Sequence, residues 1–414
     1  MTPSTFVVLC PHFDPDTAPT GVVMSRIVRE LAALGHRVHV VTALPWYREH
    51  RVEPEWRSTR WRDRTEVTAW GSVARLDPHA GGDKRNLLRR AVGFLGFSVT
   101  ATVAGCRAGR GERIDAVIAM SPPLTMGIAG RLVAWRRRAP LVFNIQDVFP
   151  DAAIETGAIR NRWVIAVARV LERLSYRLSD RVTVLSDDLA DNVRTKLASK
   201  RADRVVVIPN FVDTEAITPL DRDTGYRREL GLDDRPVVMY AGNIGYSQSL
   251  DLVLAAARAL PDVAFVINGN GSARDELRRA AAGLDNVVFG EYQPSERLSE
   301  VLATADIHVV PLRRGLGRVS VPSKTYSIMA AGRPIVAAID AGTEVTRLIA
   351  GAGCGVVVAP DSPAEFVAAV ASLVRDEGAR RVMGAGARVF VEQQASPRAV
   401  AEAYAALVGT LSRP

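Results

Sequence analysis

The sequence predicts an α/β protein built from two Rossmann-like, doubly wound domains that face each other across a cleft. Two observations carry this prediction. The chain has 414 residues, which is more than one hydrophobic core usually serves. Short apolar runs also alternate with helical patterns in both halves. Strands that alternate with helices form right-handed crossover units and a parallel sheet.

The predicted strands occur in two separate series. Those of the first half read FVVLC, HRVHVVT, IDAVIAM, PLVFNIQ, DRVTVLS and RVVVIPN. Those of the second half read PVVMYAGN, VAFVINGNG, NVVFGEY, ADIHVVPL, PIVAAID and CGVVVAP. Two sheets are therefore expected, with ligands binding at the carboxyl ends of the strands, as in other doubly wound folds.

A connector rich in Pro and Asp, VIPNFVDTEAITPLDRDTGY, separates the two series. We expect an N-terminal domain over residues 1–212 and a C-terminal domain over 213–390. The remaining segment, 391–414, contains an amphipathic helix from about Ser396 to Leu411. We expect it to pack back toward the N-terminal domain.

The composition is that of an ordinary soluble protein, with 48% apolar and 24% charged residues. The net charge of +8 comes almost wholly from Arg and suits nucleic acid, an anionic membrane or a phosphorylated ligand. No basic face with interleaved aromatic residues supports nucleic acid binding. The three Cys residues are far apart and predict neither a disulfide framework nor a metal site.

The longest apolar stretch, from Ala91 to Gly105, is too short to span a bilayer, which takes about 20 residues. Basic residues precede it from Lys84 onward. Two interpretations are open for the 84–105 region: an interfacial helix that contacts anionic lipid, or a core helix. Because the chain runs almost directly into its first strand, we expect a cytoplasmic protein, at the inner face of the membrane if the first interpretation holds.

The turn after the first strand, HFDPDTAPTG, opens a helix near Gly21, where backbone N–H groups can meet an anion. It is not the GxGxxG of dinucleotide enzymes. Asp14 and Asp16 resemble a metal-binding pair, but their Pro-rich loop favours a turn, so no metal is predicted. At the end of a later strand, Gln146 and Asp147 are candidates for holding a sugar hydroxyl or, in the case of Asp147, for assisting proton transfer. Capping a turn is the alternative.

In the second half, YAGNIGYSQSL combines a strand, a Gly-bearing turn and a helix, and INGNG follows the next strand. Such turns let a diphosphate approach backbone amides closely. Lys324 lies at the start of a later helix. A cation there is unfavourable unless an anion neutralises it. This position is the strongest indication of a phosphate ligand.

Several motifs occur together in this order. The second half contains YAGNIGYSQSLD, INGNG, ADIHVVPL, VPSK, SIMAAGRPIV and GTE, and the first half contains HFDPD, LPWY and QDVFPD. This set of motifs resembles the family-4 glycosyltransferases of the GT-B fold. The similarity is to the branch that includes WbuB and WcaI. The resemblance implies a retaining transferase without a metal or other cofactor. It places the donor diphosphate near Gly242, Asn243 and Gly245, the base near Gly290, and Gly21 close to the phosphate.

The chain departs from this family at charged positions. Many members carry Arg and Lys where it has Asn243 and Gln248, and a Glu-x7-Glu motif where it has Val319 and Ser327. Lys324, helped by Arg318, is the expected replacement for the positive charge, and Glu344 either binds a hydroxyl or caps its helix. The predicted catalytic residues are Asp147, Gln146 and Lys324. The predicted donor-binding residues are Gly21, Gly242, Asn243, Gly245, Gln248, Asn268, Gly290, Arg318, Ser323 and Glu344.

The expected reaction moves a sugar, an N-acetylhexosamine or a deoxyhexose, from a UDP-sugar to a lipid-linked saccharide in polysaccharide or O-antigen assembly. One alternative is transfer to a soluble small molecule or secondary metabolite. An alternative of another class is a GT-B epimerase or phosphorylase, in which Lys324 would bind pyridoxal phosphate.

Overall fold

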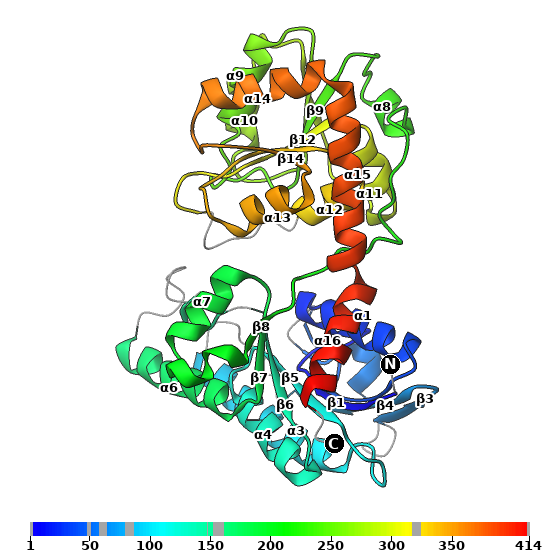
Figure 1. Cartoon of the computed structure of the whole chain (residues 1–414), viewed down its shortest axis with the longest axis vertical. Helices are drawn as coiled ribbons and strands as arrows, with labels where there is room; N and C mark the ends of the chain where they lie inside the picture. The colour runs from blue at the N-terminus through cyan, green and yellow to red at the C-terminus, as the bar shows by residue number, and fades with distance from the viewer. Residues whose placement is uncertain are drawn as a thin grey trace. The chain divides into compact units, whose positions relative to one another are not determined.

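The computed structural model describes residues 3–47, 51–57, 64–78, 87–146, 148–151, 161–316 and 324–411. The chain forms two compact units (Figure 1). The N-terminal unit comprises Met1–Asn210 and Val400–Pro414, and the C-terminal unit comprises Phe211–Ala399. The first boundary thus lies two residues before the one expected from the sequence. The segment expected over 391–414 is divided, because its first residues belong to a helix of the C-terminal unit.

The N-terminal unit is built on an eight-stranded sheet of order β3-β4-β2-β1-β5-β6-β7-β8. Its strands are β1 Thr5–Leu9, β2 Arg37–Ala43, β3 Thr65–Thr68, β4 Gly71–Leu76, β5 Ala116–Ser121, β6 Leu141–Ile145, β7 Arg181–Val184 and β8 Val205–Val207. The pairs are parallel except for β3 with β4. The sequence analysis missed this edge hairpin, because β3 is exposed and contains no apolar run.

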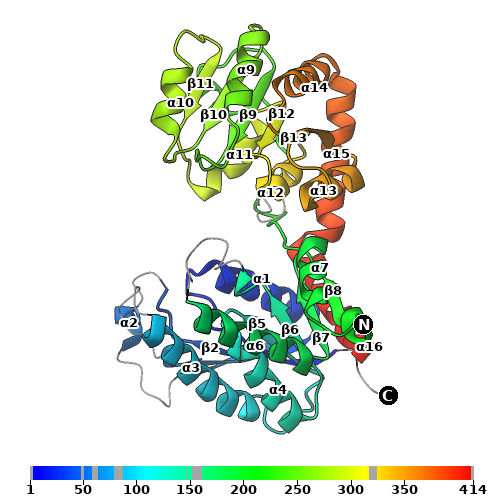
Figure 2. The same cartoon turned by 90° about the vertical axis from the view of Figure 1, so that its left-hand side faces the viewer.

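Helices cover both faces of this sheet. They are α1 Pro19–Ala33, α2 Pro54–Arg57, α3 Leu87–Arg107, α4 Thr125–Arg137, α6 Arg162–Leu178, α7 Asp187–Thr195, the 3-10 helix η2 Ser199–Arg204, and α16 Pro397–Leu411. Figure 2 shows α3, α4 and α6 side by side. Phe97 and Ala101 of α3 are buried in one core with Val7 and Leu9 of β1, as expected of a core helix. Within the described ranges, no helix has the length and apolar character needed to cross a membrane.

The last helix, α16, is joined to the N-terminal sheet by buried hydrogen bonds. The Tyr404 hydroxyl accepts from the Asn144 side-chain amide at 2.6 Å and lies 3.2 Å from the Thr183 hydroxyl. All three side chains are buried. Since polar groups removed from water need partners, this network ties the chain's end to β6 and β7.

The C-terminal unit contains a six-stranded sheet of order β11-β10-β9-β12-β13-β14. Every pair is parallel. The strands are β9 Val237–Ala241, β10 Ala264–Asn268, β11 Val287–Gly290, β12 Ile307–Pro311, β13 Ile335–Ala338 and β14 Gly355–Val358. The strand order reverses between β9 and β12. Doubly wound sheets bind ligands at this kind of switch point, outside the carboxyl ends of the strands.

Two cores lie on opposite faces of this sheet. One contains Val238 and Tyr240 of β9, and the other contains Ile335 and Ala337 of β13. The helical segments are α8 Gly225–Glu229, α9 Asp251–Ala259, α10 Arg274–Ala280, η3 Ser295–Arg297, α11 Leu298–Ala303, α12 Lys324–Ala330, α13 Glu344–Ala352, α14 Pro363–Arg375 and α15 Glu377–Gln394. The fold is thus two Rossmann-like domains with parallel sheets, as the sequence predicts.

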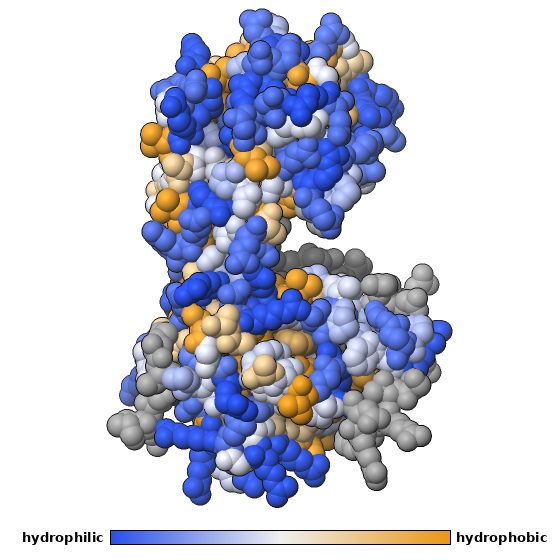
Figure 3. Space-filling model, turned by 90° about the vertical axis from the view of Figure 1, so that its right-hand side faces the viewer, coloured by the Kyte–Doolittle hydropathy of each residue, from blue (hydrophilic) through white to orange (hydrophobic). Residues whose placement is uncertain are grey.

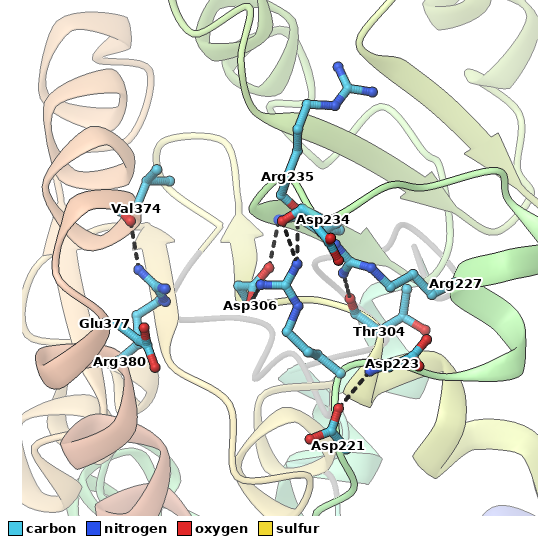
Figure 4. A network of polar contacts seen from close by, with 12 residues as sticks. Asp221, Asp223, Arg227, Asp234, Arg235, Thr304, Asp306, Val374, Glu377 and Arg380 are labelled. Atoms are coloured by element: carbon cyan, nitrogen blue, oxygen red, sulfur yellow. Dashed lines mark hydrogen bonds and ion pairs between the residues drawn. The ribbon is translucent and has the colours of Figure 1, made fainter.

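An ionic network holds the entry segment of the C-terminal unit against its sheet (Figure 4). Arg222 lies 3.2 Å from the Asp306 carboxylate and donates to the Asp234 carbonyl. Arg227 donates to the Thr304 carbonyl at 3.0 Å. Asp306 also accepts from the Val237 amide at the start of β9. The segment that follows the domain boundary is therefore fixed to β9 and β12.

Removing the Tyr404 hydroxyl tests the attachment of α16. We expect Tyr404→Phe to lower the free energy of unfolding by about 1–3 kcal/mol, because the buried Asn144 amide loses an acceptor. Urea unfolding measures the effect. The matched control is Tyr246→Phe at an exposed tyrosine, which should change stability by less than about 0.5 kcal/mol. Equal effects of the two substitutions would contradict this account.

Candidate functional site

Two glycine-bearing turns pack against each other at the carboxyl ends of β9 and β10. The Gly242 amide donates to the Asn268 carbonyl at 2.9 Å, and the Ile244 amide donates to the Asn270 carbonyl at 2.8 Å. A Cβ atom at Gly269 would lie 2.0 Å from the Gly242 carbonyl oxygen. Gly242 and Gly269 also have φ angles of 141° and 137°, which side chains rarely allow. Glycine is therefore needed for the two turns to meet.

The amides of the first turn are largely engaged inside the protein. Besides Gly242 and Ile244, the Gly245 amide donates to the Gln248 side-chain oxygen at 3.0 Å. These three N–H groups are donated within the protein and are not available to a diphosphate in this structure. The exposed Asn243 is the residue of this turn that faces solvent. The Gln248 side chain thus folds back and accepts a hydrogen bond from the backbone of this turn.

Lys324, the first residue of α12, places its ammonium group beside this turn. The Nζ atom lies 3.8 Å from the centre of the Tyr240 ring, a distance at which a cation is attracted to an aromatic face. A Cβ atom at Gly242 would lie 2.9 Å from Nζ. Within the described part of the chain, Lys324 forms no ion pair or hydrogen bond. Burial lowers its pKa from the ordinary 10.5 to about 7.

Three of the predicted residues line one cavity of about 140 Å³, namely Gly242, Asn268 and Lys324. Tyr292 and Gln293, which follow β11, lie on its wall. These residues come from the ends of neighbouring strands and from the start of α12. Gly242, Asn268 and Lys324, which the sequence predicts to bind the donor, thus lie together at the switch point of the sheet.

The position of the Asn268 side chain requires a glycine at residue 290. The buried Asn268 side chain accepts a hydrogen bond from the Tyr226 hydroxyl. A Cβ atom at Gly290 would lie 2.4 Å from the Asn268 side-chain oxygen and 2.5 Å from the Tyr226 hydroxyl. Gly290 therefore leaves room for this hydrogen bond, which holds Asn268 at the cavity wall. Tyr226 could not be predicted from any sequence pattern, because it lies 42 residues before Asn268 in the chain.

Glu344 is the first residue of α13, and its side chain is nearly buried. It lies 3.0 Å from the Arg347 guanidinium, one turn further along the helix. Burial first, and then the Glu344 charge, raise the pKa of Tyr326. A carboxylate at a helix N-terminus is favoured electrostatically, so its position agrees with the capping alternative as well as with hydroxyl binding.

In the N-terminal unit, Gly21 makes room for a histidine. A Cβ atom at Gly21 would lie 2.8 Å from the Cβ atom of His12. The His12 ring stacks on Trp46 with 5.3 Å between the ring centres, and its Nδ1 atom lies 2.7 Å from the Asp16 carboxylate. Asp16 also accepts from the Tyr47 amide at 3.3 Å. The sequence analysis missed His12, because only the fold brings Trp46 beside it.

The Asp14–Pro15–Asp16 loop is a turn, as the sequence analysis favoured. Asp14 pairs with Arg29, whereas the buried Asp16 pairs with His12. The two carboxylates thus have separate partners. Among the residues that the structure describes, no three His, Cys, Asp or Glu side chains come together as a metal site would require.

Gln146 lies directly after β6 and is nearly buried. Its amide donates to the Asn144 side-chain oxygen at 2.7 Å, and Asn144 in turn donates to Tyr404. Gln146 therefore belongs to the network that holds α16. Three predicted site residues, Asp147, Arg318 and Ser323, lie outside the described residues.

Comparison with known proteins identifies the family. Residues 20–210 match the Glycosyl transferase 4-like domain, and residues 235–376 match Glycosyl transferases group 1. This chain is a GT-B glycosyltransferase. The glycosyltransferase is 29% identical to the putative colanic acid biosynthesis glycosyl transferase WcaI of Escherichia coli K12, over 87% of this chain and 89% of WcaI.

Two further similarities cover most of the chain. The glycosyltransferase is 27% identical to a D-inositol 3-phosphate glycosyltransferase of Xylanimonas cellulosilytica, over 75% of each protein. Its fold is similar to that of Anabaena Alr3699/HepE, solved in complex with UDP, with a TM-score of 0.66 and 14% identity over 99% of this chain and 100% of the other. The fold and the resemblance to the WcaI branch are thus confirmed.

The lowered pKa of Lys324 predicts that the free energy of unfolding depends on pH. Because the pKa of Lys324 is about 7 in the folded protein and 10.5 in the unfolded chain, the unfolded chain binds more protons between these values. Wild-type stability therefore gains from this group as pH rises through that window. We expect Lys324→Met to be more stable than wild type, most clearly at or below pH 7, with the advantage shrinking toward pH 10.5.

Urea unfolding at several pH values measures this difference. Lys200→Met, at an exposed lysine, is the control and should show no such dependence. A constant difference between Lys324→Met and wild type across the window would refute the lowered pKa.

Proposed function

We propose that this glycosyltransferase moves a sugar from a UDP-sugar to a lipid-linked saccharide, with retention of anomeric configuration and without a metal ion. The sugar is an N-acetylhexosamine or a deoxyhexose. One observation carries the donor side of the proposal: the Lys324 ammonium lies at the switch point of the C-terminal sheet, and the described residues offer it no counter-ion. A cation that is largely withdrawn from water and has no counter-ion is costly, and a diphosphate is the ligand that offsets this cost.

The proposed mechanism assigns Lys324 to the leaving group. As the glycosidic bond breaks, negative charge builds on the departing diphosphate, and a fixed cation in a site with little water stabilises it. Gly242 leaves space beside Nζ, so phosphate oxygens can approach the ammonium directly. Asn243 offers side-chain donors from the solvent side, and Arg318 and Ser323 are proposed to assist.

The other predicted residues are assigned either to the donor or to the acceptor. Asn268 and Gly290 lie at the strand ends proposed to hold the base, and Glu344 is proposed to accept a hydrogen bond from a ribose or sugar hydroxyl. Gln146 and Asp147 are proposed to hold hydroxyl groups on the acceptor side. Gly21, in the first turn of α1, is proposed to let backbone N–H groups meet the donor phosphate.

The similarity to WcaI, named for colanic acid biosynthesis, supports a saccharide acceptor in polysaccharide assembly. A second candidate is a soluble acceptor, which the similarity to a D-inositol 3-phosphate glycosyltransferase favours. Turnover with a panel of UDP-sugars, measured with lipid-linked and water-soluble acceptors, separates the two. A phosphorylase would instead show pyridoxal phosphate absorbance.

Binding of UDP tests the role of Lys324. We expect Lys324→Ala to weaken UDP binding about 10- to 100-fold, the loss typical of a charge-assisted hydrogen bond. Wild-type affinity should fall as pH rises above about 7, because the free amine then loses the proton that the complex requires. The variant should lack this dependence. Calorimetric titration measures both effects.

Lys200→Ala controls for the loss of a lysine elsewhere on the protein. Near-wild-type affinity or turnover of Lys324→Ala, in a protein with an unchanged unfolding midpoint, would exclude Lys324 from donor binding.

Metal independence and stereochemistry are tested together. We expect turnover to be unchanged after treatment with a chelator, because Lys324 supplies the charge that a cation would otherwise provide. Proton NMR of the product should show the anomeric configuration of the donor sugar. Loss of turnover on chelation with recovery on adding Mg²⁺, or an inverted product, would contradict the corresponding part of the proposal.

A further inference from the structure

The face formed by α3, α4 and α6 of the N-terminal unit carries an unusual row of exposed apolar side chains. These helices pack side by side on one face of the sheet (Figure 2). The clearest case is α6, where Trp163, Val167, Val170 and Leu174 are all exposed. Their spacing places them on one side of the helix. Trp163 is 83% and Val170 is 63% exposed.

The inward side of α6 is the more polar one. The buried residues of this helix are Ala168, Glu172, Ser175 and Tyr176. A helix that only covers a sheet directs its apolar stripe inward. In α6 the larger apolar stripe points outward, so core packing does not account for it.

The two neighbouring helices extend this surface. On α3 the exposed apolar residues are Leu95, Val99 and Val103, spaced four residues apart, and on α4 they are Leu132 and Trp135. We call these residues, together with the α6 stripe, the outer helical face. By contrast, hydrophilic residues cover most of the C-terminal unit on the face drawn in Figure 3, and apolar residues occur there in scattered spots. Extended exposed apolar surfaces mark interaction sites.

The charged residues of these helices are almost all positive. Their sequences contain ten Arg residues and one acidic residue, Glu172. The Glu172 side chain is 1% exposed and is neutralised by Lys196 at 2.5 Å. The arginines are Arg89, Arg90, Arg107, Arg131, Arg136, Arg137, Arg162, Arg169, Arg173 and Arg177. These helices therefore present no exposed carboxylate.

We propose that the outer helical face lies on an anionic lipid bilayer. Exposed Trp, Val and Leu side chains would enter the interfacial region. Lipid phosphates would meet the exposed arginines, which are Arg107, Arg136, Arg162, Arg169, Arg173 and Arg177. A second copy of the chain is a poorer partner, because a symmetric contact would bring two arginine-rich surfaces together. The proposal extends the expected contact of the 84–105 region to α4 and α6, and it stands independently of the donor site.

Vesicle flotation of the full chain tests this proposal. We expect binding to vesicles of phosphatidylcholine mixed with phosphatidylglycerol, weaker binding to phosphatidylcholine alone, and a decrease with added salt. The double substitution Trp163→Glu, Val170→Glu should lower binding at least about tenfold. The matched control is Val382→Glu on α15 of the C-terminal unit, a position that is 73% exposed. It should bind as wild type does.

Thermal unfolding checks that the variants fold. If the double variant is destabilised, Val99→Glu on α3 is the second probe of the same face. Absence of wild-type binding to the mixed vesicles at low salt, or undiminished binding of the folded variants, would overturn the proposal. A wild-type dimer that the double variant dissociates, with no vesicle binding, would assign the face to a second copy and overturn it as well.

Discussion

The candidate donor site depends on the backbone hydrogen bonds that continue from β9 and β10 into the turns that follow them. The Gly242 and Ile244 amides reach carbonyls of the neighbouring turn at 2.9 and 2.8 Å. This contact is possible because Gly269 lacks a Cβ atom, which would otherwise meet a carbonyl oxygen. The paired turns set the wall beside which the Lys324 ammonium lies.

We expect Lys324 to destabilise the unliganded protein. Its side chain is only partly exposed, the described residues offer it only the Tyr240 ring, and burial lowers its pKa to about 7. Functional sites often contain groups whose pKa is displaced in this way, because the ligand supplies the missing interaction. In the proposed function, the same group that weakens the fold stabilises the leaving diphosphate.

The N-terminal unit combines two polar networks with the exposed apolar side chains of the outer helical face. Stacking on Trp46 and the Asp16 carboxylate orient His12, and the Asn144 network fastens α16 to the sheet. The outer helical face has no comparable polar partners on its apolar stripe. We therefore attribute this face to a contact with a partner outside the chain, which we propose is a lipid bilayer.

The two parallel sheets could be predicted from the sequence, since alternating apolar runs and helical patterns reflect local periodicity. The strand-end positions of Gly242 and Asn268 also pointed to the donor site, because the carboxyl ends of parallel strands meet at one edge. Lys324 was indicated by its place at the start of a helix, where a cation calls for an anion. The sequence could not reveal that the amides of the Gly242 turn are already donated, or that Gly290 makes room for Tyr226. Nor could it place Trp46 on His12 or show the outward stripe of α6. Each of these depends on contacts between residues distant in the chain, and only the tertiary structure decides such contacts.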